Sequence, residues 1–343
     1  MVKLSLVERK PLTRNVESEQ PTVGVIDAIS TGFERVFRHP WLLIIPILLD
    51  LFLWVGPRLD ASALYDQLSP SLKQMSTGLD TDSQQAVQEM DQVMRDFLTH
   101  YNLYAWLSVG IVGVQTINSS LDATARLVTG AMPTVSQIGD LGGYLLAAVG
   151  LSLIGLCLAG FFWALLGLQF RDEAFSLTAW LKRGAVLSVR LLSLAVTLLI
   201  GVVLLMLPIS MLTVFVGALS IGLASFIPAL ALTALTWLAF YFLFTVHGLV
   251  LYQFTWQKAA RFSAMIARVF FVPTLGLAVL SLAIYIGLGL IWDSIAPDSW
   301  LRLIAIVGNA FIATGLAMAS LVYYQNRSSI LFERLHFPKP AGN

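Results

Sequence analysis

The sequence predicts an all-α protein, namely a polytopic integral membrane helix bundle with six transmembrane helices and amphipathic interfacial helices. The first observation is composition: of 343 residues, 57% are hydrophobic and only 12% are charged. The mean hydropathy is +0.79, which excludes an ordinary soluble domain. The second observation is a set of charge-poor stretches long enough to cross the hydrocarbon core, which needs about 20 apolar residues in a helix.

Five stretches of the chain have this length and contain no basic residue. They are residues 39–57, 141–170, 191–257, 269–292 and 303–326, and only the first contains an acidic residue, Asp50. The stretch 191–257 is long enough for two crossings, and the glycines and serine within 217–222 predict the turn between them. The count is therefore six spans.

These spans divide the chain into five regions. We expect a cytoplasmic N-terminal segment with an amphipathic helix (1–40), a first transmembrane helix (41–57), an extracytoplasmic helical loop (58–140), a five-helix transmembrane region (141–326) and a cytoplasmic tail (327–343). The first 20 residues are charged throughout and lack the apolar core of a cleavable signal peptide. The first span is therefore expected to stay in the mature protein.

Basic residues predict the orientation of the chain. With a cytoplasmic N-terminus, the predicted cytoplasmic segments carry 16 Lys and Arg residues and the opposite side carries five. Cytoplasmic loops of membrane proteins are enriched in Lys and Arg. Both termini are therefore predicted to be cytoplasmic.

The loop 58–140 is acidic and is expected to be largely helical. Val87, Met90, Val93 or Met94, and Phe97 form an apolar stripe at helical spacing. The apolar segment 103–114 is too short for a span, and a seventh crossing would violate the charge rule. We therefore expect an interfacial or re-entrant helix there, packed against the bundle.

Short basic amphipathic helices are predicted before the first, third and fifth spans. Before the first span, for example, Ile26, Ile29, Phe33, Val36 and Phe37 recur at helical spacing. Such helices lie in the headgroup plane with their cations on anionic lipid. The alternative is that these cations only mark topology. The candidate interfacial cations are Arg35, Arg38, Lys182, Arg183, Lys258, Arg261 and Arg268.

Few polar groups lie within the predicted spans, and the intramembrane candidates are Asp50, His247 and Asn309. An acid at this depth is costly, so Asp50 is expected to face the bundle rather than lipid. We expect a protonated carboxyl group that is hydrogen-bonded to His247 or Asn309. A structural role is favoured over ion or proton conduction, because no second acid accompanies Asp50.

The sequence shows no pattern that indicates catalysis or metal binding. The four histidines are scattered, the single cysteine is Cys157, and no Walker A sequence occurs. We therefore assign no catalytic, cofactor-binding or metal-binding residue and expect no enzyme, while a bound pigment or lipid stays open. The near balance of 21 basic and 20 acidic residues argues against nucleic-acid binding.

Two segments carry a resemblance to a known group of proteins. Asp27-Ala28-Ile29-Ser30, followed by Phe37-Arg38-His39-Pro40-Trp41, and the later segment 256–263 lead into predicted spans. This arrangement resembles uncharacterised bacterial multi-span membrane proteins, including the membrane domain attached to some glycerophosphodiester phosphodiesterases. The printed sequence does not include their soluble phosphodiesterase domain, so the resemblance implies a six-helix membrane fold and no activity.

These observations favour a non-catalytic structural, assembly or accessory subunit of the bacterial cytoplasmic membrane. Its expected partners are the lipid bilayer and either another membrane protein or a second copy of the chain. The alternative is a small-solute or lipid permease, which helix-weakening prolines such as Pro208 and Pro228 favour.

Overall fold

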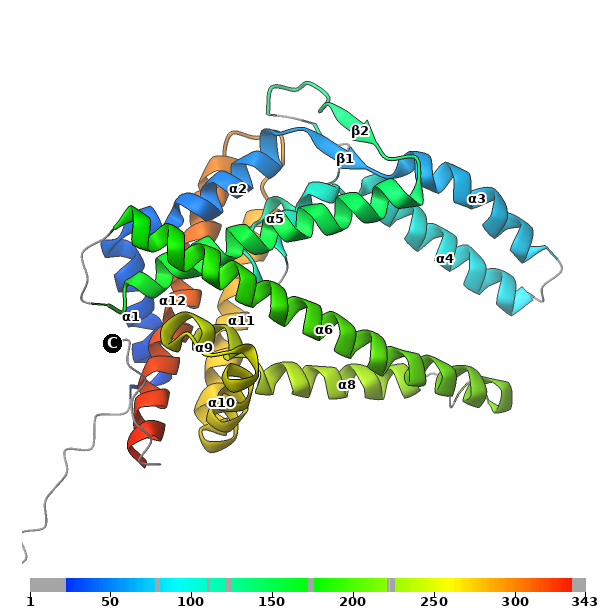
Figure 1. Cartoon of the computed structure of the whole chain (residues 1–343). Coiled ribbons are helices and arrows are strands. Elements are labelled where there is room, and N and C mark those ends of the chain that lie inside the picture. Colours follow the sequence, from blue (N-terminus) through cyan, green and yellow to red (C-terminus); the bar gives the residue numbers. More distant parts are fainter. Residues whose placement is uncertain are drawn as a thin grey trace, which may run out of the picture.

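The structure is a computed structural model that describes residues 23–334, apart from 78–80, 110–111, 121, 123–124, 127, 172–175, 221 and 223–225. Helices form most of the described chain, which confirms the predicted all-α class. Figure 1 shows the elements along the chain, which are α1 (Val25–Arg38), the 3₁₀ helix η1 (Pro40–Leu43), α2 (Ile44–Val55), β1 (Arg58–Asp60), α3 (Ser62–Ser76), α4 (Thr81–His100), the 3₁₀ helices η2 (Leu103–Ser108) and η4 (Asn118–Ser120), β2 (Val135–Gln137), α5 (Leu141–Leu168), α6 (Leu177–Leu219), α8 (Phe226–Tyr241), α9 (Thr245–Tyr252), α10 (Trp256–Val269), α11 (Phe271–Asp293) and α12 (Arg302–Arg334).

Five helices are long and apolar enough to cross a membrane, and each overlaps a predicted span, although Leu177–Gly217 begins before residue 191 and Arg302–Arg334 continues beyond residue 326. These helices are Leu141–Leu168, Leu177–Gly217, Phe226–Tyr252, Phe271–Asp293 and Arg302–Arg334. A sixth is added only if Val25–Arg38 and Pro40–Val55, which meet at 95°, count as one bent span. The described chain therefore has five or six helices of this kind.

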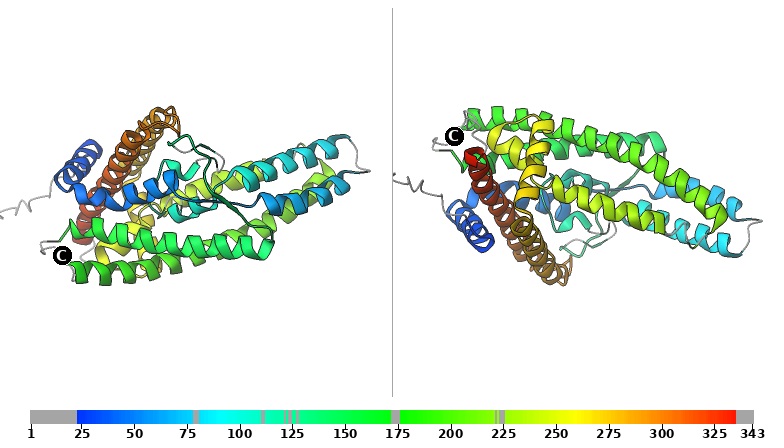
Figure 2. Two further views of the ribbon diagram at one scale, coloured as in Figure 1. Left: turned by 90° about the horizontal axis from the view of Figure 1, so that it is seen from above. Right: turned by 90° about the horizontal axis from the view of Figure 1, so that it is seen from below.

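The long helices lie in two groups. α5, α6 and α8 run in similar directions, whereas α11 and α12 form a pair with a different direction (Figures 1 and 2). α9 contacts α5, α6 and α12, so it lies where the two groups meet. α3 and α4 form a hairpin that extends to the side opposite α1, the side to which the far ends of α6 and α8 also extend.

Small residues allow the close approach of several helices. A Cβ atom added at Gly160 of α5 would lie 2.1 Å from Ser188 Oγ of α6, and one added at Gly184 would lie 2.1 Å from a ring atom of Phe161. Similarly, a Cβ at Gly32 of α1 would lie 2.5 Å from the backbone nitrogen of Ala319 on α12. Close backbone contact of this kind is typical of helix packing in membrane proteins.

α1 packs along α12 with one face. Ala28, Gly32 and Val36, which are spaced four residues apart, are buried, while Ile26 and Phe37 are 74% and 78% exposed. The predicted separate amphipathic helix is confirmed before α2, and α10 is likewise separate from α11. The protein covers one face of α1 and leaves large apolar side chains on the other.

The prediction of a separate basic helix before the third span is wrong. Lys182, Arg183 and Arg190 lie on α6, which continues without a break from Leu177 to Leu219. The reason is local, because residues 177–207 contain no proline and the turn at Ser188 is held against α5 by a hydrogen bond from Ser188 Oγ to the Cys157 carbonyl at 3.2 Å. The helix therefore propagates through the basic segment instead of stopping there.

The loop 58–140 contains the predicted helices together with a feature that the sequence analysis missed. α3 and α4 confirm the helical prediction, but β1 and β2 form a short parallel pair in which Arg58 lies beside Val135. The segment 103–114 packs against α5 as expected, with Trp163 Nε1 donating to the Val112 carbonyl at 2.9 Å. Its described helix is the short 3₁₀ helix η2, and residues 110–111 lie outside the described residues.

Candidate functional site

Asp50 is the centre of a buried polar network. Its side chain lies on α2 and is 1% exposed. Oδ2 accepts a hydrogen bond from the backbone N–H of Ile117 at 3.0 Å, and Oδ1 accepts from the backbone N–H and the Nδ2 group of Asn118 at 2.9 and 2.8 Å. Because all three groups donate, the arrangement favours an ionised carboxylate, which only accepts. The sequence pattern had predicted a protonated carboxyl group instead.

Asn118 connects this carboxylate to a buried guanidinium group. Arg302, at the start of α12, is 4% exposed and donates from Nε to Asn118 Oδ1 at 3.0 Å. Its Nη1 atom donates to the carbonyls of Trp292 and Ile295 at 3.0 Å each. These carbonyls lie at the C-terminal end of α11, where a cation is electrostatically favourable. The network therefore extends from α2 to the turn between α11 and α12.

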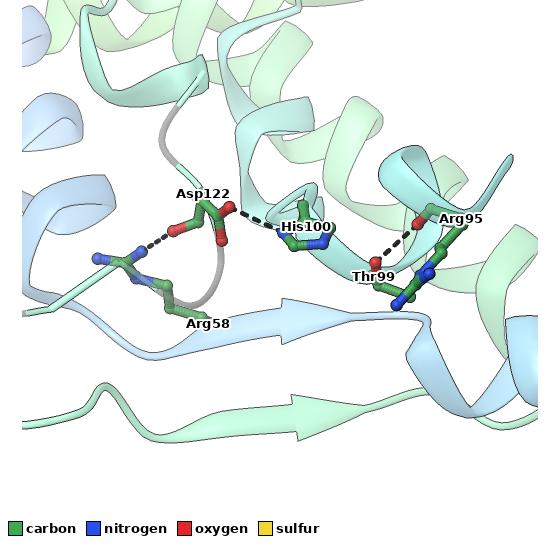
Figure 3. A network of polar contacts seen from close by, with 5 residues as sticks. All are labelled: Arg58, Arg95, Thr99, His100 and Asp122. Atoms are coloured by element: carbon green, nitrogen blue, oxygen red, sulfur yellow. Dashed lines mark hydrogen bonds and ion pairs between the residues drawn. The ribbon is translucent and has the colours of Figure 1, made fainter. Parts of the chain in front are cut away.

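A second arginine extends the polar contacts to the base of the α3–α4 hairpin (Figure 3). Arg58 is 0% exposed, and its guanidinium group donates to the Asp122 backbone carbonyl. His100 Nδ1, at the end of α4, lies 2.9 Å from the Asp122 carboxylate. Burial lowers the pKa of Arg58, while the nearby Asp122 carboxylate opposes this shift. Figure 3 also shows Thr99 donating to the Arg95 carbonyl within α4.

The chemistry of this network is suited to holding segments together. Asp50 and Arg302 are buried charges of opposite sign, and Asn118 links them through hydrogen bonds at each end. Trp54 adds a further connection by donating from Nε1 to the Pro297 carbonyl at 2.6 Å. Buried charges are tolerated when hydrogen bonds of this kind satisfy them. The network joins α2, residues 117–122 and the α11–α12 turn, which are far apart in the sequence.

The predicted partners of Asp50 are wrong. His247 lies on α9, where Nε2 is 2.6 Å from Ser320 Oγ and the ring contacts Trp163 and Phe244. Asn309 is buried on α12, and its Nδ2 atom has no hydrogen-bond partner within the described part of the chain. The three intramembrane candidates are therefore not gathered in one site, because the segment around Asn118 supplies the hydrogen bonds to Asp50.

The interfacial candidates lie in several places. Arg35 lies over the Phe170 ring with 4.4 Å from its Cζ atom to the ring centroid, which connects α1 to the end of α5. Arg38 pairs with Glu34 on the same helix, and Lys258 lies over the Phe254 ring at 4.4 Å. Arg261 and Arg268 are exposed on α10, whereas Lys182 and Arg183 line a pocket between α5, α6 and α9.

The sequence pattern did not predict that Asn118, Arg302 and Arg58 take part in these polar contacts. Arg302 directly precedes an apolar span and Arg58 directly follows one, so both appeared as ordinary flanking cations. Their burial, at 4% and 0% exposure, distinguishes them from such cations. An asparagine after a short apolar segment is a weak signal, and only the fold brings it to Asp50.

The fold and this network define an all-α protein with several helices apolar enough for membrane insertion. Comparison of the chain with protein-family models finds no match, and neither does comparison with curated proteins or with solved structures. Within the described residues, no group of three or more His, Cys, Asp or Glu side chains is placed to hold a metal ion.

Proposed function

We propose that this chain is a non-catalytic integral membrane protein that acts as a structural, assembly or accessory subunit. In this proposal the α3–α4 hairpin binds another membrane or extracytoplasmic component. The observation that carries the proposal is the exposed face of α4, called its outer face below, which carries large apolar side chains although α4 belongs to the acidic loop.

The outer face of α4 combines apolar and acidic side chains. Met90, Val93 and Phe97 are 45%, 68% and 43% exposed, and their spacing places them on one side of the helix. Glu89 and Asp96 are exposed beside them. Exposed apolar side chains that gather on one face favour an interaction surface.

The packing of the hairpin itself depends on other residues. Ala61, Leu64, Leu98 and Leu103 form a small buried cluster at its base. Further out, the Tyr65 hydroxyl donates to the Asp91 carboxylate at 3.1 Å and joins α3 to α4. The outer face of α4 is therefore left for a partner, and its chemistry fits an apolar surface bordered by Lys or Arg.

The orientation is part of the same proposal. The basic asymmetry of the sequence favours an extracytoplasmic location of the hairpin, and we propose a bacterial cytoplasmic membrane as its site. A partner would therefore be either a membrane protein with an extracytoplasmic surface or a second copy of this chain.

Site-specific photocrosslinking in cells tests this proposal. A photoreactive amino acid at Val93 should give a protein adduct of defined mass, and the charge reversals Glu89→Lys and Asp96→Lys should reduce its yield. The control position is Val214 on α6, which is 75% exposed on a helix expected to face lipid. An adduct of twice the chain mass would identify a second copy as the partner. Adducts that are the same from both positions, or unaffected by the charge reversals, would contradict the proposal.

A pocket at the other end of α5 favours the alternative, a protein that handles lipids or small solutes. It is lined by cations and apolar side chains, which is the chemistry of an amphiphile site. Transport would require that a bound molecule be carried across, and the test is uptake into proteoliposomes with and without the purified chain.

A further inference from the structure

A pocket of about 370 Å³ lies between α5, α6 and α9. Four of its lining residues are basic, namely Arg171, Lys182, Arg183 and Arg190, and none is acidic. The carboxylates nearest in sequence, Asp172 and Glu173, lie outside the described residues. Cations that line a pocket attract a bound anion.

The continuous α6 helix explains how the cations reach one pocket. One side of α6 carries both basic and apolar side chains. The basic residues Lys182, Arg183 and Arg190 and the apolar residues Val186 and Leu187 lie three or four positions apart along it. Lys182 and Arg190 are eight residues apart, which corresponds to about 12 Å along the helix axis. The cations therefore extend from the beginning of α6 toward its apolar part.

The remaining wall of the pocket is mainly apolar. α5 contributes Ala164 and Leu168, and α9 contributes Leu249 and Val250. Val186 of α6 is 42% exposed, so apolar surface continues from the pocket to the outside of the helix. A molecule that fits these walls carries a negative charge next to a hydrocarbon part.

We propose that this pocket binds the phosphate headgroup of an anionic phospholipid, with an acyl chain along the apolar wall. Arg and Lys bind phosphate oxygens through charge-assisted hydrogen bonds, and Arg190 is placed to contact the part of the lipid next to the chain. A soluble phosphate ester has the same headgroup chemistry, but it makes no use of Leu168, Val186 and Leu249. This inference is independent of the α3–α4 hairpin and of its partner.

Native mass spectrometry of the full chain in a mild non-ionic detergent tests the site. Phosphatidylglycerol should bind more tightly than phosphatidylcholine with the same acyl chains. Lys182→Gln and Arg190→Gln should each weaken phosphatidylglycerol binding about fivefold, which is the expected effect of one cation near an anionic lipid. Lys182 is exposed, so its substitution tests the site without disturbing the packing of α6.

The matched controls are Lys73→Gln and Arg95→Gln, which remove exposed cations of the α3–α4 hairpin. These variants should bind phosphatidylglycerol as the parent does. Equal loss in the control and pocket variants, or equal binding of the two lipids, would overturn the proposal. Displacement of phosphatidylglycerol by an equal concentration of glycerol phosphate would assign the pocket to a soluble phosphate ester and overturn the lipid assignment.

Discussion

Substitution of Asp50 should lower the stability of the protein, and the loss should be larger when more donors lose their acceptor. Three N–H groups from Ile117 and Asn118 lie 2.8–3.0 Å from its two carboxylate oxygens. In Asp50→Asn, the carbonyl oxygen can keep the two bonds from Asn118, and the new NH₂ group then faces the N–H of Ile117. In Asp50→Leu, all three donors lose their partner.

The expected magnitudes follow from these counts. A buried donor left without an acceptor costs about 1–3 kcal/mol, so Asp50→Asn should cost about 2 kcal/mol. Asp50→Leu should cost about 6 kcal/mol for three such donors. It also removes an acid from an apolar helix, which recovers about 3 kcal/mol. The net loss for Asp50→Leu is therefore about 3 kcal/mol, larger than that for Asp50→Asn.

Thermal unfolding in a mild detergent, followed by circular dichroism, checks this order. One kcal/mol corresponds to about 2 °C for a chain of this size, so the parent, the Asn variant and the Leu variant should unfold at successively lower temperatures. The control is Asp66→Asn, the same chemical change at an exposed position of α3. An Asp50→Leu variant that unfolds at or above the temperature of the parent would refute the proposed structural role.

Three further predictions concern packing, pH and topology. Gly160→Ala should cost about 1–3 kcal/mol through overpacking against α6. Gly150→Ala on the same helix, where a Cβ meets no atom within 4 Å, should not destabilise the protein. Equal melting temperatures of these two variants would contradict the close contact at Gly160. Desolvation and the hydrogen bond to the Asp91 carboxylate raise the pKa of Tyr65 above the ordinary value of 10.0. The hydroxyl therefore contributes to the stability of the hairpin below pH 10, and this contribution is lost as the pH rises through the raised pKa. Proteolysis of the hairpin should therefore increase at alkaline pH in the parent, and the Tyr65→Phe variant should show no such increase. Single cysteines at the exposed positions Gln74 and Arg334, in a cysteine-free background, should be labelled from opposite sides of intact cells, and labelling of both from outside would contradict the predicted topology.

The sequence predicted the long helices well because their signal is local. The charge-free stretch 141–170 corresponds to α5 at Leu141–Leu168, and the break predicted within 217–222 lies close to the end of α6 at Leu219. Length, hydrophobicity and glycine content are sufficient for such elements. The exceptions are the start of α6 and the end of α12, where a change in polarity was interpreted as a helix boundary although the backbone continues.

The polar network and the pocket depend on contacts between distant segments, and their signals are weak in the sequence. Asn118 reaches Asp50 across 68 positions of the chain, and Arg302 reaches Asn118 across 184. β1 and β2 have three residues each, which is too short for a periodic pattern. Two of the four cations of the pocket, Lys182 and Arg183, were predicted as interfacial residues, but the wall supplied by α9 appears only in the fold.

The two proposed binding regions, the α3–α4 hairpin and the pocket, lie at opposite ends of α5. The orientation of α5 in the membrane therefore decides on which side each region lies. α5 has 28 residues, so its ends are about 42 Å apart, which exceeds the roughly 30 Å of a hydrocarbon core. If α5 crosses the membrane, the acidic hairpin beside its first residue and the cationic pocket beside its last turn face opposite leaflets. The positive-inside rule then places the pocket at the cytoplasmic leaflet, where anionic lipid attracts cations. Labelling of the hairpin from the cytoplasmic side would exclude an extracytoplasmic partner. It would also place the pocket at the extracytoplasmic leaflet, so the topology experiment should be performed first.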